Sequence, residues 1–275
     1  MSNPIQNRYD FVFIFDVKDG NPNGDPDQAN LPRVDPENQE GLITDVCIKR
    51  KVRNYIQLSQ KGNGYGIFIR QGNILAQDVD NTPGDKAEDR QRELCRKYYD
   101  IRAFGAVMSV GDKGAGTVRG PVQFTFARSE DRIFQAEHSI TRCCVTTEKE
   151  AKAQEGREFA STMGRKSTVP YALYRMHGFV SAVDAQKTGF SEDDLRLLWE
   201  ALRNAFEHDR SAARGEMSAR KLVIFKHSNH LGTARATELF KRVKIERKND
   251  IPRDFNDYVI SIDKNNLTGI EVMEK

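Results

Sequence analysis

The chain contains little cysteine and lacks long apolar runs, and each shortage excludes a class of protein. It has 4 cysteines among 275 residues, none of them in a CxxC pair. Adjacent Cys143 and Cys144 suit neither a zinc site nor an easy mutual disulfide. No apolar run approaches the length of about 18 residues that a membrane helix needs, and residues 1–8 are too polar for a signal peptide. The sequence therefore predicts a soluble, reduced, cytoplasmic protein with no membrane partner.

The chain as a whole lacks a large excess of charge of either sign, but two of its segments are strongly charged. The 43 basic and 40 acidic residues leave a net charge of +3. Residues 1–45 hold nine acidic and three basic side chains, whereas residues 210–248 hold eleven basic and three acidic ones. The local charges are therefore −6 and +8. A basic segment of this density is typical of contacts with polyanions or acidic partner surfaces.

The hydrophobic pattern near the N-terminus predicts a central strand at residues 9–17. One face of this run carries Phe11, Phe13 and Phe15, and the other face carries Val12 and Ile14. A strand that is apolar on both sides is expected inside a sheet that is covered on both faces.

A loop of about two dozen residues, rich in Gly, Asn, Pro and Asp, connects this strand to a basic helix. Loops of that length within a domain are uncommon and are usually functional or disordered. Thr44 is the predicted N-cap, and Ile48, Val52, Tyr55 and Ile56 recur at helical spacing. The opposite side of the helix carries Lys49, Arg50, Arg53, Asn54 and Gln57. The pattern predicts a rigid positive edge, and an ordinary solvated helix face is the alternative.

The loop also resembles the first half of a calcium-binding EF-hand. Asp19, Asn21, Asn23 and Gly24 match its opening pattern, but Asn30 stands where a bidentate Glu is needed. A strand precedes this loop, whereas a helix precedes an EF-hand loop. Consecutive Asx and proline turns are the favoured interpretation, and no metal site is predicted.

Two further segments partly match known ligand-binding motifs, but each lacks a residue that the motif requires. Residues 111–120 (GDKGAGTVRG) have the glycine interval of a phosphate loop, but Thr117 replaces its lysine and Arg119 replaces the third glycine of GxGxxG. Two readings remain, a flexible turn or a backbone-rich surface that phosphates approach, and Arg119 would serve the second. His227 and His230 form an HxxH pair without a third ligand nearby, so polar or RNA-contacting histidines are favoured over zinc ligands.

Two segments are predicted to project from the core. Two short apolar runs within residues 61–77 flank Gln71-Gly72-Asn73, which predicts a hairpin, and a helix follows through residue 100. Residues 139–147 and 169–183 are β-prone and enclose a charged segment. That segment predicts a protruding hairpin, with an apolar tip at Phe159 and Met163 and cationic sides at Arg165 and Lys166. An apolar wedge can separate stacked bases while nearby cations neutralise phosphates. A disordered surface loop is the alternative.

The remaining elements complete a fold of α+β class. A helix over residues 190–208 is predicted to begin at the N-cap Ser191, with Trp199 in its buried stripe. A short helix is predicted at residues 233–241. Strands are predicted at residues 221–225, 243–246 and 258–262, the last at an edge. The order of strand, basic helix, strands with insertions, amphipathic helix and strand fits a ferredoxin-like βαββαβ core with long excursions.

Six strings of residues carry a resemblance to a known family. They are NPNGDP (21–26), LPR (31–33), GLITDVCIKRKVRNY (41–55), DIRAFGAV (100–107), GPVQFTFARS (120–129) and VPYALYRMHGFVSA (169–182). In these strings the chain resembles the crRNA-binding backbone subunit of type I CRISPR Cascade complexes, most closely the type I-C, Csd-type member. The resemblance implies one RRM-like palm domain over residues 1–275. A finger-like insertion is implied near residues 62–100, and a thumb hairpin near residues 139–170.

The resemblance implies a non-enzymatic subunit that needs no cofactor and has no catalytic or metal-binding residues. Several copies are expected to assemble head to tail along the crRNA and present it to target DNA, together with the large subunit and the crRNA-processing cap subunit of the type I-C complex. Guided recognition leaves sequence reading to base pairing, so the protein is expected to contact phosphates and sugars. The predicted RNA-binding residues are Arg33, Lys49, Arg50, Arg53, Arg119, Arg142, Phe159, Met163, Arg165 and Lys166.

Two rival functions follow from the same residues. Type III backbone relatives cut target RNA with an acidic loop residue, and Asp25, Asp27 and Asp35 lie in a comparable loop, which allows a metal-dependent ribonuclease. A general single-stranded RNA-binding module without a guide is the second rival. The ribonucleoprotein signature of an RRM is missing, because HGFVSA from His177 is only a faint echo of it, so base stacking on the sheet is not predicted.

Overall fold

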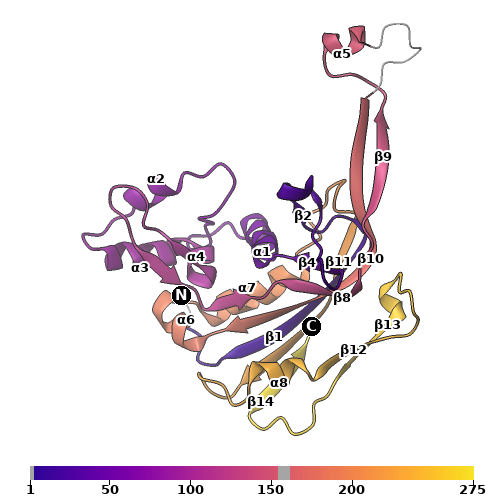
Figure 1. Cartoon of the computed structure of the whole chain (residues 1–275). Coiled ribbons are helices and arrows are strands. Elements are labelled where there is room, and N and C mark those ends of the chain that lie inside the picture. The colour runs from indigo at the N-terminus through magenta and orange to yellow at the C-terminus, as the bar shows by residue number, and fades with distance from the viewer. Residues whose placement is uncertain (1–2, 154–161) are drawn as a thin grey trace.

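An antiparallel sheet of eight strands organises the computed structural model, which describes residues 3–153 and 162–275 (Figure 1). The strand order is β14-β11-β1-β10-β8-β4, and β7 and β9 also pair with β10. These strands are β1 (Tyr9–Gly20), β4 (Glu40–Ile43), β7 (Val122–Phe124), β8 (Ala127–Arg132), β9 (Ala136–Arg142), β10 (Thr162–Val180), β11 (Glu216–His227) and β14 (Ile270–Glu274).

The other elements are helices and three short two-stranded ribbons. The ribbons pair β2 (Gly24–Asp25) with β3 (Leu31–Pro32), β5 (Gly105–Val107) with β6 (Thr117–Arg119), and β12 (Val243–Arg247) with β13 (Tyr258–Ile262). The α-helices are α1 (Asp45–Ser59), α2 (Leu75–Asp80), α3 (Ala87–Lys97), α4 (Tyr99–Phe104), α5 (Glu148–Lys152), α6 (Ala182–Thr188), α7 (Glu192–Arg203) and α8 (Ala236–Phe240). Two short 3-10 helices are η1 (Pro26–Gln28) and η2 (Phe255–Asp257). Within the described ranges, none of the helices combines the length and apolar character that a bilayer crossing requires.

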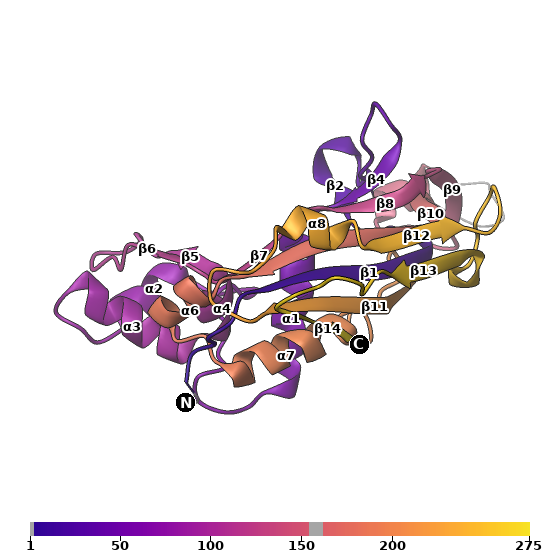
Figure 2. The ribbon, with the colours of Figure 1, turned by 90° about the horizontal axis from the view of Figure 1, so that it is seen from below.

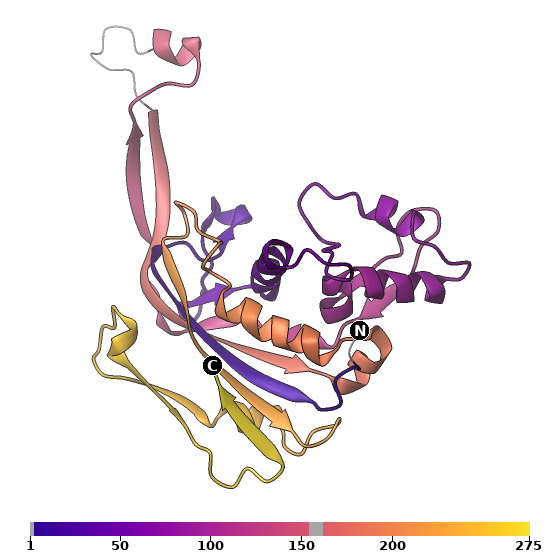
Figure 3. The same cartoon turned by 180° about the vertical axis from the view of Figure 1, so that it is seen from behind.

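Strand β1 lies at the centre of the sheet and is buried on both faces, which confirms the prediction for residues 9–17. Its three phenylalanines join an apolar cluster with residues of α1 and α7. These two helices lie on one face of the sheet (Figure 3). Val12 and Ile14 join a second cluster with residues of α8, β12 and β13. These elements lie over the other face of the sheet (Figure 2). Each fully buried side chain of this size contributes about 1.5–3 kcal/mol relative to an exposed one.

Close packing between β1 and β10 requires glycine at position 178. Gly178 pairs with Phe11, and a Cβ there would lie 2.0 Å from the Phe11 ring. That ring is held edge-on against Trp199 at a centroid distance of 5.0 Å, so it has little room to move. We expect Gly178→Ala to lower the free energy of unfolding by about 1–3 kcal/mol, measured by urea denaturation. Gly164→Ala on the same strand is the control, because its Cβ would meet its nearest atom at 3.9 Å; equal stability of both variants would contradict the expectation.

The two long helices begin where the capping signals predicted. The Thr44 side chain accepts a hydrogen bond from the Cys47 N–H, and the Ser191 side chain forms a capping box with Asp194. Such caps contribute about 0.5–2 kcal/mol each. They fix the start of each helix and so the faces that α1 and α7 turn toward the sheet.

The hairpin predicted around residues 71–73 is wrong. Residues 67–73 form bends and a turn, and α2 begins at Leu75. The reason is a distant side chain: the Asp100 carboxylate accepts the N–H groups of Phe68 (2.8 Å) and Ile69 (3.0 Å), so these donors need no partner strand. The sequence reading also missed β14, a short strand that forms one edge of the sheet. Strand β13, predicted as an edge strand, pairs with β12 in a separate two-stranded ribbon, where among the described residues it has no second partner strand, so that prediction is confirmed.

Helices α2, α3 and α4 lie with β5 and β6 beside one end of the sheet (Figure 2). This region has its own apolar cluster, which includes Phe68, Leu94 and Ile101. A buried bidentate ion pair fastens it to α7: Arg102 donates from Nη2 to Asp194 Oδ1 (2.7 Å) and from Nε to Oδ2 (2.9 Å). The region is therefore anchored rather than loosely appended.

Strand β9 and the first part of β10 form a hairpin that projects far from the sheet (Figure 1). Its register runs from Ala136 opposite Thr168 to Arg142 opposite Thr162. Met163 is 77% exposed near its outer end. Phe159, the other predicted tip residue, lies outside the described residues.

Candidate nucleic-acid interface

A cleft of about 1250 Å³ opens beside helix α1. Its walls come from the loop before α1, the outer face of α1, the bends at residues 67–71 and the turn at residues 211–214. Segments that are far apart in the sequence therefore meet around the basic helix α1.

The cleft is lined by cations and amides. Six basic side chains line it: Arg33, Lys49, Arg50, Arg53, Arg70 and Arg214. Six amides lie among them: Asn21, Asn23, Asn30, Asn54, Gln57 and Gln71. Among the described residues that line the cleft, none is acidic. Cations with amides in a cleft without carboxylates match the phosphates and sugar hydroxyls of a nucleic-acid strand.

Carboxylates outside the lining hold most of these cations in place. The ion pairs join Arg33 to Asp25 (3.3 Å), Lys49 to Asp45 (2.9 Å), Arg53 to Asp100 (2.9 Å), Arg70 to Asp78 (3.5 Å) and Arg214 to Asp209 (2.9 Å). Arg50 differs, because it is exposed and forms no ion pair with a carboxylate in the described part of the chain. It is thus the cation most available to a ligand.

Arg53 belongs to the floor of the cleft rather than to its rim. It is buried, and its Nε donates to Asp100 Oδ2 at 2.9 Å. Its guanidinium also lies over the ring of Phe104, at 5.3 Å from the centroid. Part of its role is therefore structural, because it compensates a carboxylate that is itself almost fully buried.

The loop before α1 is fixed to both neighbouring walls. Asn23 Oδ1 accepts hydrogen bonds from the Thr44 N–H (3.0 Å) and hydroxyl (3.1 Å), and the Asn21 N–H donates to the Ala213 carbonyl (2.8 Å). Gly20 is required for this approach, since a Cβ there would lie 1.7 Å from the Arg214 carbonyl oxygen. The asparagines of the EF-hand-like pattern are thus used within the protein, and the loop shapes the cleft.

The structure brings together four predicted RNA-binding residues, and it places five others outside the lining of the cleft. Arg33, Lys49, Arg50 and Arg53 line the cleft. Arg119 is 80% exposed on β6 and pairs with Asp184 at 3.6 Å. The hairpin carries Arg142, Met163, Arg165 and Lys166.

Sequence reasoning missed Arg70 and Arg214. The dense positive charge of residues 210–248 was the only feature of the sequence that indicated a binding role for Arg214. Arg70 had no signal, because the predicted hairpin placed it in an insertion away from the basic helix.

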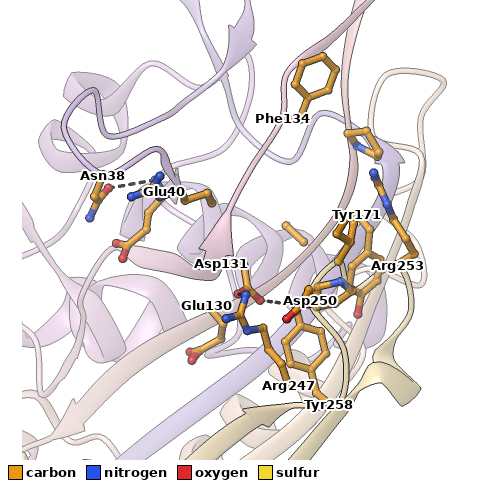
Figure 4. A pocket seen from close by; sticks show the side chains of 15 residues that line it. Asn38, Glu40, Glu130, Asp131, Phe134, Tyr171, Arg247, Asp250, Arg253 and Tyr258 are labelled. Carbon is orange, nitrogen blue, oxygen red and sulfur yellow. Dashed lines mark hydrogen bonds and ion pairs between the residues drawn. The ribbon is translucent and has the colours of Figure 1, made fainter.

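Another pocket, of about 630 Å³, lies at the base of the hairpin and differs in charge (Figure 4). Asp131 accepts a hydrogen bond from the Tyr258 hydroxyl (2.6 Å) and pairs with Arg247 (3.1 Å). Glu130 pairs with Arg175 at 2.8 Å. Four carboxylates line this pocket, those of Glu40, Glu130, Asp131 and Asp250, whereas no carboxylate of the described residues lines the cleft. This pocket is therefore a poorer site for a polyanion than the cleft.

His227, half of the HxxH pair, is a structural residue. Its Nε2 lies 2.8 Å from Asp10 Oδ2, and its Nδ1 accepts the Thr233 N–H at 3.0 Å. Both ring nitrogens are therefore occupied within a fully buried site. Among the described residues, no group of three or more His, Cys, Asp or Glu side chains could hold a metal ion.

Fold and cleft together define a class: a mixed α/β protein with a large antiparallel sheet and a cleft suited to a polyanionic strand. Residues 7–263 match the family described as CRISPR-associated protein Cas7, and the chain belongs to that family. The resemblance found in the sequence is thereby confirmed at the level of the family.

Two known proteins illustrate the relationship. A CRISPR-associated protein Cas7 of Haloferax volcanii is 27% identical over 233 residues, which cover 72% of this chain and 65% of that protein. The chain thus spans about 65% of the length of this curated relative. A chain of a CRISPR RNA-guided surveillance complex, pre-nicking, shares the fold with a TM-score of 0.53 at 13% identity, over 79% of this chain and 78% of that one.

Proposed function

We propose that this chain is a non-enzymatic, crRNA-binding backbone subunit of a type I-C Cascade complex. The observation that carries the proposal is the cleft beside α1, where six basic side chains and no described acidic one face the same space. Such a surface binds phosphates whatever the base sequence, which a subunit that serves any guide requires.

The binding mode differs from that of a conventional RRM. The strand order β11-β1-β10-β7, with α1 and α7 packed in one cluster, supports an RRM-like palm. An RRM stacks bases on the open face of its sheet. Here α8, β12 and β13 cover that face over β1, so we place the guide in the cleft on the helix side.

The projecting hairpin is proposed as the thumb that wedges between guide bases. Met163 supplies an exposed apolar side chain, and Arg165 and Lys166 follow it on β10. Arg142 lies opposite on β9 and donates to the Thr146 hydroxyl at 2.6 Å. Phe159 remains a predicted tip residue. The region of α2 to α4 is proposed as the finger, with Arg119 as a further phosphate contact.

The partners follow from the same proposal. Copies of the chain contact one another head to tail along the guide, and such a heterologous contact grows as a helix rather than closing. The guide is presented to target DNA, and the large subunit and the crRNA-processing cap subunit complete the complex. Co-expression with a guide tests this: we expect a particle with nuclease-protected RNA of uniform length and several copies of the chain, measured by native mass spectrometry. A lone protomer without RNA would refute it.

We further propose that the assembled complex does not cut RNA complementary to its guide. Asp25 pairs with Arg33, and a hydrogen bond from Arg128 holds the pKa of Asp35 below its usual value. Incubation of the complex with complementary RNA and Mg²⁺ or Mn²⁺ is expected to leave that RNA intact on denaturing gels. Cleavage that disappears in Asp25→Ala, Asp27→Ala or Asp35→Ala would establish the ribonuclease instead.

A further inference from the structure

The sheet face opposite α1 is not covered everywhere. A pocket of about 450 Å³ lies where β7 and β8 run beside β10. Side chains alternate along a strand, so Arg175 and His177 share the β10 face of Leu173, which packs in the cluster under α8. This pocket, the β8–β10 pocket, is lined by Glu40, Thr125, Phe126, Arg128, Ser129, Glu130, Arg175 and His177.

A β-bulge turns an aromatic ring into this pocket. Gly178 pairs with Phe124 and Arg175 pairs with Arg128, so three residues of one strand lie opposite two of the other. The bulge is fixed by hydrogen bonds from the Thr125 N–H to the His177 carbonyl (2.9 Å) and from the His177 N–H to the Thr125 hydroxyl (3.1 Å). Bulges re-aim side chains, and Phe126 is 51% exposed here.

The neighbouring histidine is neutral and has an unmet hydrogen bond. Its ring stacks on Phe240 with centroids 4.1 Å apart and planes 2° from parallel. Burial, assisted by Arg175, lowers the pKa of His177 to about 4, so the ring is uncharged at neutral pH. Its buried Nε2 has no hydrogen-bond partner in the described structure, and such a group is costly to leave unpaired.

The rim carries paired charges of both signs. Arg175 pairs with Glu130 at 2.8 Å, and Arg128 pairs with Glu40 at 3.2 Å and with Asp35 at 2.9 Å. Balanced charge gives no advantage to a phosphate. Arginine and glutamate fixed in this way are the side chains that bond to the polar edges of bases.

We propose that the β8–β10 pocket accepts a single nucleobase, stacked on Phe126 and hydrogen-bonded at its edge by the polar rim. Its volume falls in the range of about 300–1,000 Å³ typical of small-ligand sites. Stacking on an aromatic side chain tolerates any base, because every base has a π-face. The site lies on the face of the sheet opposite α1 and its cleft, so the inference goes beyond the proposed guide binding.

Photocrosslinking tests the proposal. The purified protein is irradiated with single-stranded RNA that contains 4-thiouridine, and crosslinked tryptic peptides are identified by mass spectrometry. We expect crosslinks in peptides 120–128 and 176–187, which hold Phe126 and His177. Phe126→Ala is expected to reduce crosslinking at peptide 176–187 roughly 5- to 100-fold. Phe134→Ala is the matched control, since that ring is 70% exposed outside the pocket. Absence of crosslinks in both peptides, or an equal loss in both variants, would overturn the proposal.

Two further arms identify the occupant. The first arm compares uridine monophosphate with unlabelled RNA, at equal base concentration, as competitors of crosslinking. Competition by both would show that the pocket takes a free nucleotide, and competition by RNA alone would show that it takes a base within a strand. Both results support a nucleobase site. Crosslinks that persist in Arg50→Ala would show that the site works when cleft binding is weakened. A change in copy number in Phe126→Ala, with no crosslinks in either peptide of the unmodified protein, would assign the pocket to a protein contact and refute the proposal.

Discussion

Replacement of Arg50 by alanine is expected to weaken guide binding by one protomer roughly 10- to 100-fold, and equally for spacers of unrelated sequence. Arg50 is exposed in the cleft and has no carboxylate partner in the described part of the chain, so its charge is free to meet a phosphate. A lost charge-assisted hydrogen bond accounts for a change of this size. The slope of log affinity against log salt should fall by about 0.7, the value for one phosphate of a single strand.

Fluorescence anisotropy with labelled guides over a series of salt concentrations measures both quantities. Arg92→Ala is the control, because Arg92 is 76% exposed on α3 and lies outside the cleft. It should leave affinity and salt slope unchanged. A loss confined to particular spacer sequences would argue for contacts to base edges and against a grip on the backbone.

Arg53→Ala is expected to act mainly on stability and to lower the free energy of unfolding by about 3–5 kcal/mol. The substitution leaves the Asp100 carboxylate buried without its cation, although Asp100 still accepts the N–H groups of Phe68 and Ile69. The unpaired carboxylate then destabilises the bends that form one wall of the cleft. Chemical denaturation monitored by circular dichroism gives the magnitude.

Comparison with Arg50→Ala separates the two roles of the basic helix. Arg50 is exposed, so its removal should change the midpoint of unfolding very little. If Arg53→Ala were as stable as Arg50→Ala and differed from the unmodified protein only in RNA affinity, Arg53 would be a phosphate ligand and not part of the floor. A combined Arg50→Ala and Arg53→Ala variant cannot make this distinction.

Sequence patterns correctly predicted those elements whose signals lie within the element itself or next to it. The alternation in β1 and the caps at Thr44 and Ser191 lie within a few residues of what they specify. The positive face of α1 was predicted for the same reason, and four of the predicted contacts meet in the cleft.

Contacts between distant segments explain what the sequence could not predict. The Asp100 carboxylate accepts the N–H groups of Phe68 and Ile69, which a partner strand would otherwise bind. Asp100 lies more than thirty positions later in the sequence, so no local pattern encodes this contact. Arg53 appeared to lie on a solvated face because the helical pattern ignores Phe104, over which its guanidinium lies. Arg70 and Arg214 reach the cleft only through the folding of their segments around α1.

Strand β10 has 19 residues and runs without a break from the hairpin into the middle of the sheet. At about 3.3 Å per residue it is roughly 60 Å long, and its outer third is the arm. The arm is therefore continuous with the sheet, because the inner part of β10 is held beside β1 by eleven backbone pairings, with one position skipped between Tyr171 and Val169. A ligand that contacts the arm therefore contacts the same strand that pairs with β1 in the middle of the sheet.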